Sequence, residues 1–343
     1  MTVNDLPKIS IIIPCRNEEK FIGKCLDSIL NQEYLRLGQG FGGQAKEKLE
    51  VLVVDGMSVD RTREIIASYS KKHSNLKLID NHKKITPTAI NTGIQNSKGG
   101  VIIVLGAHTF VEGDFISKNI KYLQQTKADC VGGRVKAVGR GFWGKVISFI
   151  MSSPFGVGDA RFRYSDREGY ADTVAFGAYR REIFQKIGLF DENFRYGQDA
   201  ELNFRLIKSG GKIFFTPRIE SYYYVRSSLS ELWCQYFRYG YSKAKLFRKH
   251  ETLASVRSIV PTIFLLALFF SGVLGLFLKP FSFLFFGVCL AYLFLNIIFS
   301  FQISFKNGFK YFFPVMITFP VLHFSYGLGF LKGILDFLIL RKK

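Results

Sequence analysis

The sequence has few cysteines, and none lies at a spacing typical of a metal site or a disulfide framework. Five are scattered over 343 residues: Cys15, Cys25, Cys130, Cys234 and Cys289. Zinc sites need closely spaced Cys and His ligands, and small disulfide-stabilised domains carry cysteines far more densely. The pattern excludes both classes and is typical of a chain that folds in a reducing compartment.

Acidic residues are also scarce. Asp and Glu number 27 against 47 Lys and Arg, which gives a formal charge of +20 and a pI near 9.7. Such an excess indicates an anionic partner: a membrane surface, nucleic acid or a phosphorylated substrate. Because the sequence shows no helix-turn-helix, zinc-finger or RNA-binding signature, we expect no nucleic acid partner. The apolar C-terminal region favours anionic lipid.

The N-terminus lacks an apolar run. Its first residues are polar and lead directly into a strand pattern at Ile9. We therefore expect no cleavable signal peptide and place the polar part of the chain in the cytosol.

The sequence does contain four short, mainly apolar strand candidates, three of them rich in β-branched residues, each followed by polar or small residues. They are residues 9–13, 49–54, 76–79 and 101–105, with helical periodicity between them. Continuous apolar runs of this kind are typical of strands buried on both faces of a parallel sheet. The alternation predicts an α/β fold with a doubly wound, mostly parallel sheet, whose ligands bind beyond the carboxyl ends of the strands.

Three uncharged apolar runs close the chain, at residues 259–278, 281–301 and 311–331. Each approaches the roughly 20 residues that cross a bilayer core of about 30 Å. The third contains Pro314, Pro320 and His323, so a broken or re-entrant helix is an alternative there. The predicted domains are therefore residues 1–250, cytosolic, and residues 251–343, in the membrane.

Two features of this topology stay open. A third crossing would place the terminal Arg-Lys-Lys outside, against the positive-inside tendency. Residues 142–155 are apolar with a single lysine, which fits either a segment lying in the membrane interface or a buried helix.

Several motifs, in this order, resemble the family 2 glycosyltransferases of the GT-A fold, in particular a membrane-anchored subgroup that includes succinoglycan-biosynthesis transferases. The matching stretches are IIIPCRNEE, VVDGMSVDRT, AINTGI, FGVGDARFR, FGAYRREIF, GLFDENF, QDAELNFR and CQYFRYG. The resemblance implies a GT-A fold and transfer of a sugar from a nucleotide donor.

The resemblance also implies a nucleotide site at the first two strand ends. Its residues are Pro14, Arg16, Asn17, Glu18, Asp55 and Asn91. Asp55 is expected at the nucleobase edge, where a carboxylate accepts N–H or O–H hydrogen bonds. A turn-forming role is the alternative for Asp55, and helix capping is the alternative for Asp60.

The metal-binding position of the family is altered in this sequence. The strand end that usually carries Asp-x-Asp or Asp-Ala-His reads Gly106-Ala107-His108. Hard oxygen ligands suit Mg²⁺ or Mn²⁺ bound to a diphosphate, and Gly106 removes one of them. His108 remains as a ligand or phosphate donor, with a hydrogen-bonded turn as the alternative. A divalent cation is therefore only a possible cofactor.

Asp199 matches the family's acidic residue at the acceptor site, where a carboxylate takes the acceptor's proton. Glu201 is expected to support it; capping of a helix is the alternative for this acidic pair. Gln235, Arg238 and Tyr239 resemble the Gln-x-x-Arg-Trp motif of processive synthases, which implies contacts with the acceptor or diphosphate. An interfacial amphipathic helix is the alternative for these three residues.

The sequence thus predicts an inverting, membrane-anchored glycosyltransferase that uses a nucleotide sugar and a lipid-linked acceptor on the cytosolic face of the cell membrane. Two alternatives remain. A processive polysaccharide synthase would need more apolar spans than are present, and a non-catalytic scaffold would account for the lost carboxylate at Gly106.

Overall fold

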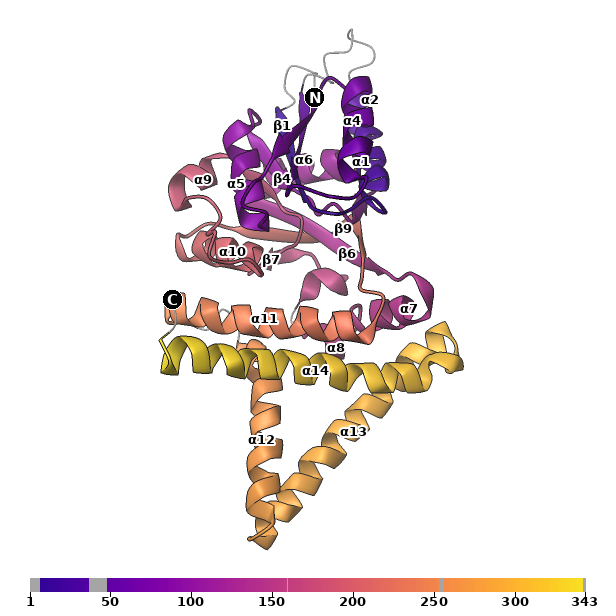
Figure 1. The fold of residues 1–343 in the computed structure, drawn as a ribbon, viewed down its shortest axis with the longest axis vertical. Helices are drawn as coiled ribbons and strands as arrows, with labels where there is room; N and C mark the ends of the chain where they lie inside the picture. The colour runs from indigo at the N-terminus through magenta and orange to yellow at the C-terminus, as the bar shows by residue number, and fades with distance from the viewer. Residues whose placement is uncertain (1–6, 37–47, 159, 253–255, 342–343) are drawn as a thin grey trace. The chain divides into compact units, whose positions relative to one another are not determined.

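The structure is a computed structural model that describes residues 7–36, 48–158, 160–252 and 256–341. The chain forms two compact units (Figure 1). The first consists of Met1–Lys136 and Tyr164–Tyr223, and the second of Ala137–Arg163 and Tyr224–Lys343. The sequence predicted a division at residue 250. The compact units divide the chain earlier because helix α11 (Leu229–His250) packs along helix α14 (Phe312–Ile334).

A nine-stranded sheet organises the first unit, with the order β3-β2-β1-β4-β8-β6-β9-β5 and β7 paired to β9. The strands are β1 Ile9–Cys15, β2 Leu49–Asp55, β3 Leu76–Asp80, β4 Val101–Val104, β5 Thr109–Val111, β6 Cys130–Val138, β7 Gly169–Ala171, β8 Ala178–Arg180 and β9 Ile213–Tyr224. Strands β3, β2, β1 and β4 are parallel. Strand β8 is antiparallel to both β4 and β6, and β9 is antiparallel to β5 and β7.

Helices cover both faces of the parallel strands, as the continuous apolar runs predict. Ile11 and Ile13 face the core that α1 (Ile22–Leu30) completes, whereas Ile12 faces α5 (Thr86–Asn96). Gly93 allows α5 to approach closely, because a β-carbon there would overlap the side chain of Ile12. The predicted α/β doubly wound fold is confirmed. The remaining helices of this unit are α2 Glu33–Arg36, α4 Thr62–Lys72, α6 Phe115–Thr126, α9 Glu182–Ile187 and α10 Gln198–Lys208.

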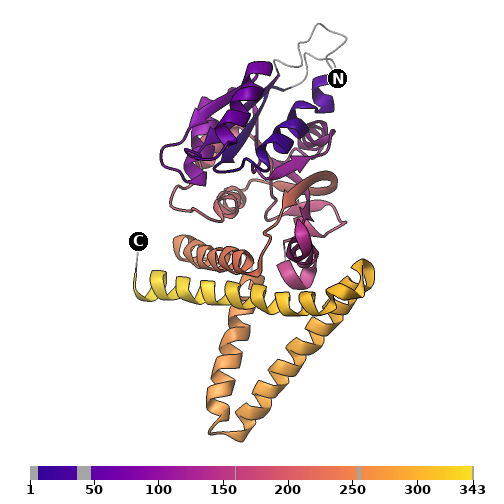
Figure 2. The same cartoon turned by 45° about the vertical axis from the view of Figure 1, so that its right-hand side comes forward.

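The second unit is helical. Figures 1 and 2 both show α11 and α14 side by side, with α12 (Val260–Gly275) and α13 (Lys279–Asn307) forming a hairpin that leaves this pair. Helix α7 (Gly141–Ile150) and the short α8 (Pro154–Val157) contact α14. Val146, Ile147 and Ile150 of α7 are fully buried, which favours the buried-helix interpretation of residues 142–155, although Phe142 remains 46% exposed.

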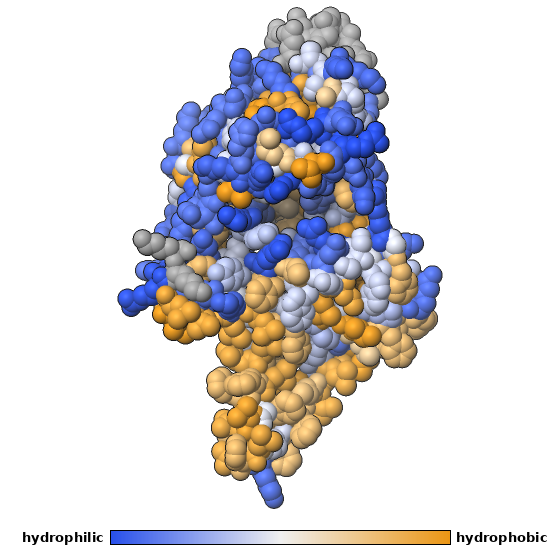
Figure 3. Space-filling model, viewed as in Figure 1, coloured by the Kyte–Doolittle hydropathy of each residue, from blue (hydrophilic) through white to orange (hydrophobic). Residues whose placement is uncertain are grey.

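Within the part of the chain that the structure describes, two helical segments are long and apolar enough to cross a membrane, by length and composition only. They are Lys279–Asn307, whose apolar window is 6% buried, and Phe309–Ile339, whose window is 50% buried. The first predicted apolar run forms α12, which has only 16 helical residues. The hairpin of α12 and α13 presents an apolar surface (Figure 3).

Candidate active site

The carboxyl ends of three parallel strands bring polar residues to one edge of the sheet. In the strand register Cys15 pairs with Asp55, and Asp55 pairs with Asp80. The loops that follow β1 and β2 begin at this edge. The strand ends, where the sequence predicts ligand-binding residues, and the loops that follow them therefore lie next to one another in the first unit.

Asp55 is fully buried, and its carboxylate is held by its own protein. It accepts hydrogen bonds from the Ser58 amide (2.9 Å) and hydroxyl (2.5 Å), and from Arg63 Nη1 (2.7 Å). Burial acts to raise the pKa of Asp55, but the hydrogen bonds from Ser58 and Arg63 outweigh it and lower the pKa. The same Arg63 nitrogen donates to Asp80 (2.8 Å), so one guanidinium joins two strand ends.

The loops after β1 and β2 are joined by hydrogen bonds around Asn17. Its amide donates to Ser58 Oγ (2.8 Å), and its side-chain oxygen accepts from the Val59 amide (3.0 Å). Asn17 has a φ of +55°, a left-handed conformation that asparagine tolerates better than most residues. Asp60 accepts hydrogen bonds from the Thr62 amide and hydroxyl, which is the capping role foreseen as its alternative.

His108 lies at this edge, held between a carboxylate and aromatic rings. Its Nδ1 lies 2.9 Å from Glu18 Oε1, and its ring packs edge-on against Tyr223 at 5.0 Å between centroids. Pairing of Nδ1 with a carboxylate leaves Nε2 as the nitrogen for a further ligand. The side chain is 27% exposed, so solvent reaches the pair.

Asp199 is exposed in the first turn of α10, where its Oδ1 accepts a hydrogen bond from the Ala200 amide (2.8 Å). One turn later, Asn203 is buried and accepts from the Tyr179 hydroxyl of β8 (2.8 Å). Asn203 also donates to Thr173 in the segment that leads to Phe176, which lies beside Gly106. A continuous set of contacts therefore links the helix that carries Asp199 with the turn that carries His108.

Comparison with known proteins identifies the family. A sequence model of glycosyl transferase family 2 matches residues 10–188. A dolichyl N-acetyl-glucosaminyl phosphate diacetamido-dideoxy-glucuronosyltransferase of Methanococcus voltae is 37% identical over 249 residues, 70% of this chain and 74% of the relative. The succinoglycan biosynthesis protein ExoA of Rhizobium meliloti is 30% identical over 253 residues, 73% of each chain.

The chain is a family 2 glycosyltransferase. It is thus an enzyme that transfers sugars, and the predicted family is confirmed. Among solved structures, a mannosyltransferase of Pyrobaculum calidifontis, in complex with GDP-Man and Mn²⁺, has a TM-score of 0.60 at 17% identity. The alignment covers 97% of this chain and 89% of that one. This likeness confirms the GT-A fold.

The glycosyltransferase provides few metal ligands. Among its described residues, no three His, Cys, Asp or Glu side chains are grouped closely enough to hold a metal ion. Glu18 and His108 form a pair, and the glycine at position 106 contributes none. Mg²⁺ commonly binds through one or two protein ligands plus substrate phosphates. The pair therefore fits a cation only when the substrate supplies most of the ligands.

Two predicted site residues of the glycosyltransferase are buried in structural contacts. The side-chain amide of Asn91 pairs with both backbone groups of Phe190, at 2.8 and 2.9 Å. Glu201 has no exposed side-chain area and forms a bidentate pair with Arg205, which also donates to the Ile187 carbonyl. In this arrangement neither side chain is directed to solvent; both fix the loop before Asp191.

The remaining predicted residues divide between the two units. Pro14 is half-buried at the end of β1 and Arg16 is exposed in the following turn. Gln235, Arg238 and Tyr239 lie on α11 in the second unit, where Gln235 Nε2 donates to the Tyr239 hydroxyl (2.9 Å). This hydrogen bond joins residues i and i+4 of one helix, so a contact within α11 explains the Gln-x-x-x-Tyr spacing.

Sequence reasoning missed Arg63 and Asp80 of the glycosyltransferase. Asp80 ends β3 in register with Asp55 and is 45% exposed, and Arg63 is 35% exposed between them. The strand-end rule applied to the third strand would have found Asp80. No pattern singles out Arg63, because one arginine among many in a basic chain reveals its partners only in three dimensions.

Proposed function

We propose that this enzyme is an inverting glycosyltransferase that moves a sugar from a nucleotide sugar to a lipid-linked acceptor, with its first unit in the cytosol and its second unit anchored in the cell membrane. The observation that carries the proposal is the exposed carboxylate of Asp199, linked by protein contacts to the strand-end turn of His108. The Methanococcus relative is named for a dolichyl phosphate-linked acceptor, and ExoA for succinoglycan biosynthesis. Both names support a lipid-linked or polysaccharide acceptor.

Asp199 has the role of general base in this proposal. Its carboxylate accepts the proton of the acceptor hydroxyl while that oxygen attacks the anomeric carbon. The bond between this carbon and the diphosphate oxygen breaks on the opposite face, which inverts the anomeric configuration. The Asp199 side chain is exposed in the first turn of α10, where a bound acceptor hydroxyl can reach it.

The loops after β1 and β2 would form the nucleotide site. Arg16 is exposed for contact with phosphate, next to the left-handed turn at Asn17. Because the Asp55 carboxylate already has four hydrogen-bond donors, including the Cys15 thiol, we propose that it positions Ser58 and Arg63, and that Arg63 and Asp80 present the polar groups nearest the nucleobase.

His108 Nε2 would hold a divalent cation, with Glu18 fixing the ring in the required tautomer. Such a cation would neutralise the diphosphate leaving group. The solved structure of the Pyrobaculum mannosyltransferase contains Mn²⁺ and GDP-Man, which supports the same pairing here. Arg238 and Tyr239 would contact the phosphate or sugar of the lipid-linked acceptor.

The decisive experiment compares the wild type with Asp199→Asn in membranes supplied with labelled nucleotide sugars and lipid acceptors. We expect turnover to fall about 10²- to 10⁴-fold, as when a positioned base is lost, with donor binding retained. Glu182→Gln, at an exposed glutamate of α9, is the matched control and should leave turnover unchanged. Equal turnover in Asp199→Asn and wild type would remove this residue from the mechanism.

The anomeric configuration of the product, determined by NMR, tests inversion independently of Asp199. Donor binding without turnover under all conditions, with and without Mn²⁺, would instead support the scaffold alternative. The altered position at Gly106 is the observation that keeps this alternative in view.

A further inference from the structure

We propose that the second unit crosses an anionic membrane twice, through the α12–α13 hairpin, and that α11 and α14 lie along the headgroup region of one leaflet. The C-terminal end would then return to the side on which α11 begins. The inference rests on the membrane anchoring in the proposed function and replaces the three crossings expected from the sequence by two.

Helix α11 cannot enter the hydrocarbon. From its middle to its C-terminal end it carries basic residues, including Arg238, Lys243, Lys245, Arg248 and Lys249. Basic side chains within the bilayer core are costly unless they reach the headgroups or pair with one another. A 22-residue helix with five such residues over three turns is therefore confined to the membrane surface or to water.

Helix α14 is attached to α11 over a long stretch. A β-carbon at Gly240 of α11 would overlap the Tyr326 carbonyl, and one at Gly329 of α14 would overlap the Phe237 carbonyl. Further along, Tyr241 donates to Asp336 (3.1 Å) and Arg248 donates to the Phe337 carbonyl. Helix α14 therefore cannot cross the bilayer without taking the basic half of α11 with it.

The free face of α14 is nevertheless apolar. Along α14 and the short helical segment that continues it (Leu335–Ile339), large exposed hydrophobic side chains recur at helical spacing, at Phe313, Ile317, Leu328, Leu335 and Ile339. One apolar stripe on a helix whose other side is packed on a basic helix is the arrangement of a helix lying in the membrane interface. The stripe would face the acyl chains and the basic residues would face the headgroups.

The hairpin differs from α14 in both burial and charge. Its exposed hydrophobic residues surround the helices, and no charged residue occurs between Lys279 and Lys306. Helix α13 has 29 residues, or about 43 Å at 1.5 Å per residue, which exceeds a core of about 30 Å even when tilted. Helix α12 has only 16 residues, or about 24 Å, and would reach across the core together with the residues that join it to Lys279.

Lys279 stands at the tip of the hairpin, next to the highly exposed Leu276 and Phe277. A hairpin that entered only halfway would leave this ammonium group in hydrocarbon. Full crossing places it among the headgroups of the far leaflet, where it is stabilised by anionic lipid.

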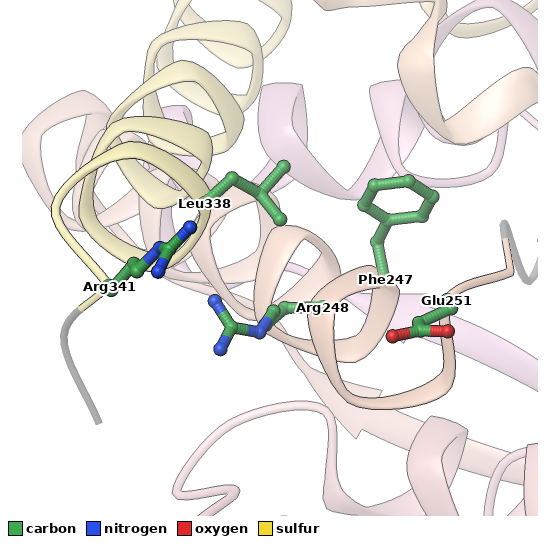
Figure 4. A pocket seen from close by; sticks show the side chains of 5 residues that line it. All are labelled: Phe247, Arg248, Glu251, Leu338 and Arg341. Atoms are coloured by element: carbon green, nitrogen blue, oxygen red, sulfur yellow. The ribbon is translucent and has the colours of Figure 1, made fainter.

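Charge identifies the occupant as an anionic bilayer. From Tyr224 to Lys343 the only acidic residues are Glu231, Glu251 and Asp336, whereas Lys and Arg recur throughout. Where α11 and α14 end together, an open cavity of about 410 Å³ is lined by Phe247, Arg248, Glu251, Leu338 and Arg341 (Figure 4). Figure 4 shows Arg248 and Arg341 extending toward one another, an arrangement that suits a lipid phosphate beside apolar side chains.

Cysteine labelling tests the topology in the full chain. The background replaces Cys234 and Cys289 with serine and retains the three buried cysteines. Single reporters are Lys121→Cys on the first unit, Lys279→Cys at the hairpin tip and Lys343→Cys at the end of the chain. In sealed vesicles of known orientation, a membrane-impermeant maleimide should label Lys121→Cys and Lys343→Cys from one face and Lys279→Cys only from the other.

Each other outcome overturns the inference. Labelling of Lys343→Cys from the Lys279 face means three crossings, and labelling of Lys279→Cys from the Lys121 face means that the hairpin does not cross. Release of the protein by alkaline carbonate means that the apolar surface serves self-association instead of insertion. Sugar transfer by the background variant is measured in parallel, so failure of the topology and failure of the proposed function are separate results.

The lipid preference has its own test. Arg248→Gln with Arg341→Gln should lower insertion into vesicles containing phosphatidylglycerol at least several-fold and leave insertion into pure phosphatidylcholine vesicles unchanged. Lys121→Gln is the control, because it also replaces a basic side chain by glutamine. Equal insertion of the double variant into both kinds of vesicle, at the wild-type level, would remove the anionic headgroup from the inference.

Discussion

At the scale of single residues, the most informative side chain is Asp55, because its carboxylate is fully buried whereas its partner Arg63 is partly exposed. Substitution by asparagine keeps the size but removes the charge that Arg63 and Ser58 stabilise. Hydrogen bonds to charged groups contribute about 1.5–3 kcal/mol. We expect Asp55→Asn to lower the Tm by about 4–8 °C at pH 7 in a thermal unfolding experiment on the detergent-solubilised chain.

The ion pair of Asp55 and Arg63 also predicts in which direction the stability of the fold changes with pH. The pKa of Asp55 in the folded chain lies below its usual value of 3.8. The carboxylate therefore stabilises the fold at pH values above 3.8, and this contribution is lost as the pH falls through the lower folded pKa. The Tm difference between wild type and Asp55→Asn should thus be full at pH 7 and shrink below about pH 4.

Asp80→Asn is the control for both measurements. Asp80 pairs with the same Arg63 nitrogen but is 45% exposed, and exposed pairs contribute roughly 0–1 kcal/mol. A Tm loss in Asp80→Asn as large as that in Asp55→Asn would show that burial of Asp55 is not the cause.

Position 106 is the second residue that allows a sharp test. A β-carbon there meets Thr109 Oγ1 at 3.3 Å and otherwise only ordinary contacts, so a larger side chain fits with a small adjustment. Gly106→Asp would add a hard oxygen ligand beside Glu18 and His108. We expect Mn²⁺ to bind at least about tenfold more tightly in the presence of nucleoside diphosphate, measured by the loss of the free Mn²⁺ signal in electron paramagnetic resonance.

Gly106→Ala introduces the same β-carbon without a carboxylate and is the matched control. If Gly106→Ala and Gly106→Asp bind Mn²⁺ equally, the glycine at this position does not limit metal binding.

At the scale of elements, the sequence pattern predicts the strands and helix ends that depend on neighbouring residues. The four parallel strands were predicted from their short, mainly apolar runs. Asp199 lies at a helix start and remains exposed, as an acidic residue in a first turn should. These features depend on residues close together in the sequence.

Long-range contacts were not predictable from the same patterns. Asn91 and Phe190 are 99 residues apart, and no periodicity shows that the asparagine amide would be used by that backbone. Arg205 removes Glu201 from solvent through a pair that looks like an ordinary surface i, i+4 spacing. Likewise, the apolar run at 311–331 meets the length rule for a membrane span, but its glycines at 327 and 329, and Gly333 just after it, serve packing on other helices.

That packing gives a prediction for the pair of α11 and α14. Gly240→Leu would force the helices apart, because its β-carbon already overlaps the Tyr326 carbonyl. We expect faster cleavage by protease after Lys243 or Lys245 and a lower Tm of the second unit, of the order of several degrees, as for other overpacked sites.

Gly287→Leu on α13 provides the control. No described atom lies within 4 Å of a β-carbon at Gly287, so the same substitution should be tolerated there. Equal protease sensitivity of the two variants would show that the α11–α14 contact does not depend on close backbone approach.

At the scale of the whole molecule, the chain combines a water-exposed catalytic fold with an apolar hairpin. An enzyme acting on a lipid-linked acceptor needs its site near the bilayer, since the acyl chain of such an acceptor stays in the hydrocarbon. In the proposed topology the hairpin would supply this by insertion, and the basic excess of the chain would favour anionic lipid.

If the first unit binds the donor and the hairpin anchors the enzyme, disabling the hairpin should affect membrane attachment and leave donor binding intact. Leu290 and Phe294 of α13 are each 65% exposed and have no role in the first unit. Leu290→Arg with Phe294→Arg places two charges in the middle of the segment, where each costs about 2.5–3.5 kcal/mol in a bilayer. We expect most of the double variant to leave the membrane fraction, to keep its binding of nucleotide sugar, and to lose transfer to a long-chain lipid acceptor while retaining transfer to a short, water-soluble analogue.

Leu290→Ala with Phe294→Ala keeps the segment uncharged and should remain in the membrane. Loss of both transfers in the arginine variant, with donor binding intact, would mean that the hairpin contributes to catalysis itself and is more than an anchor.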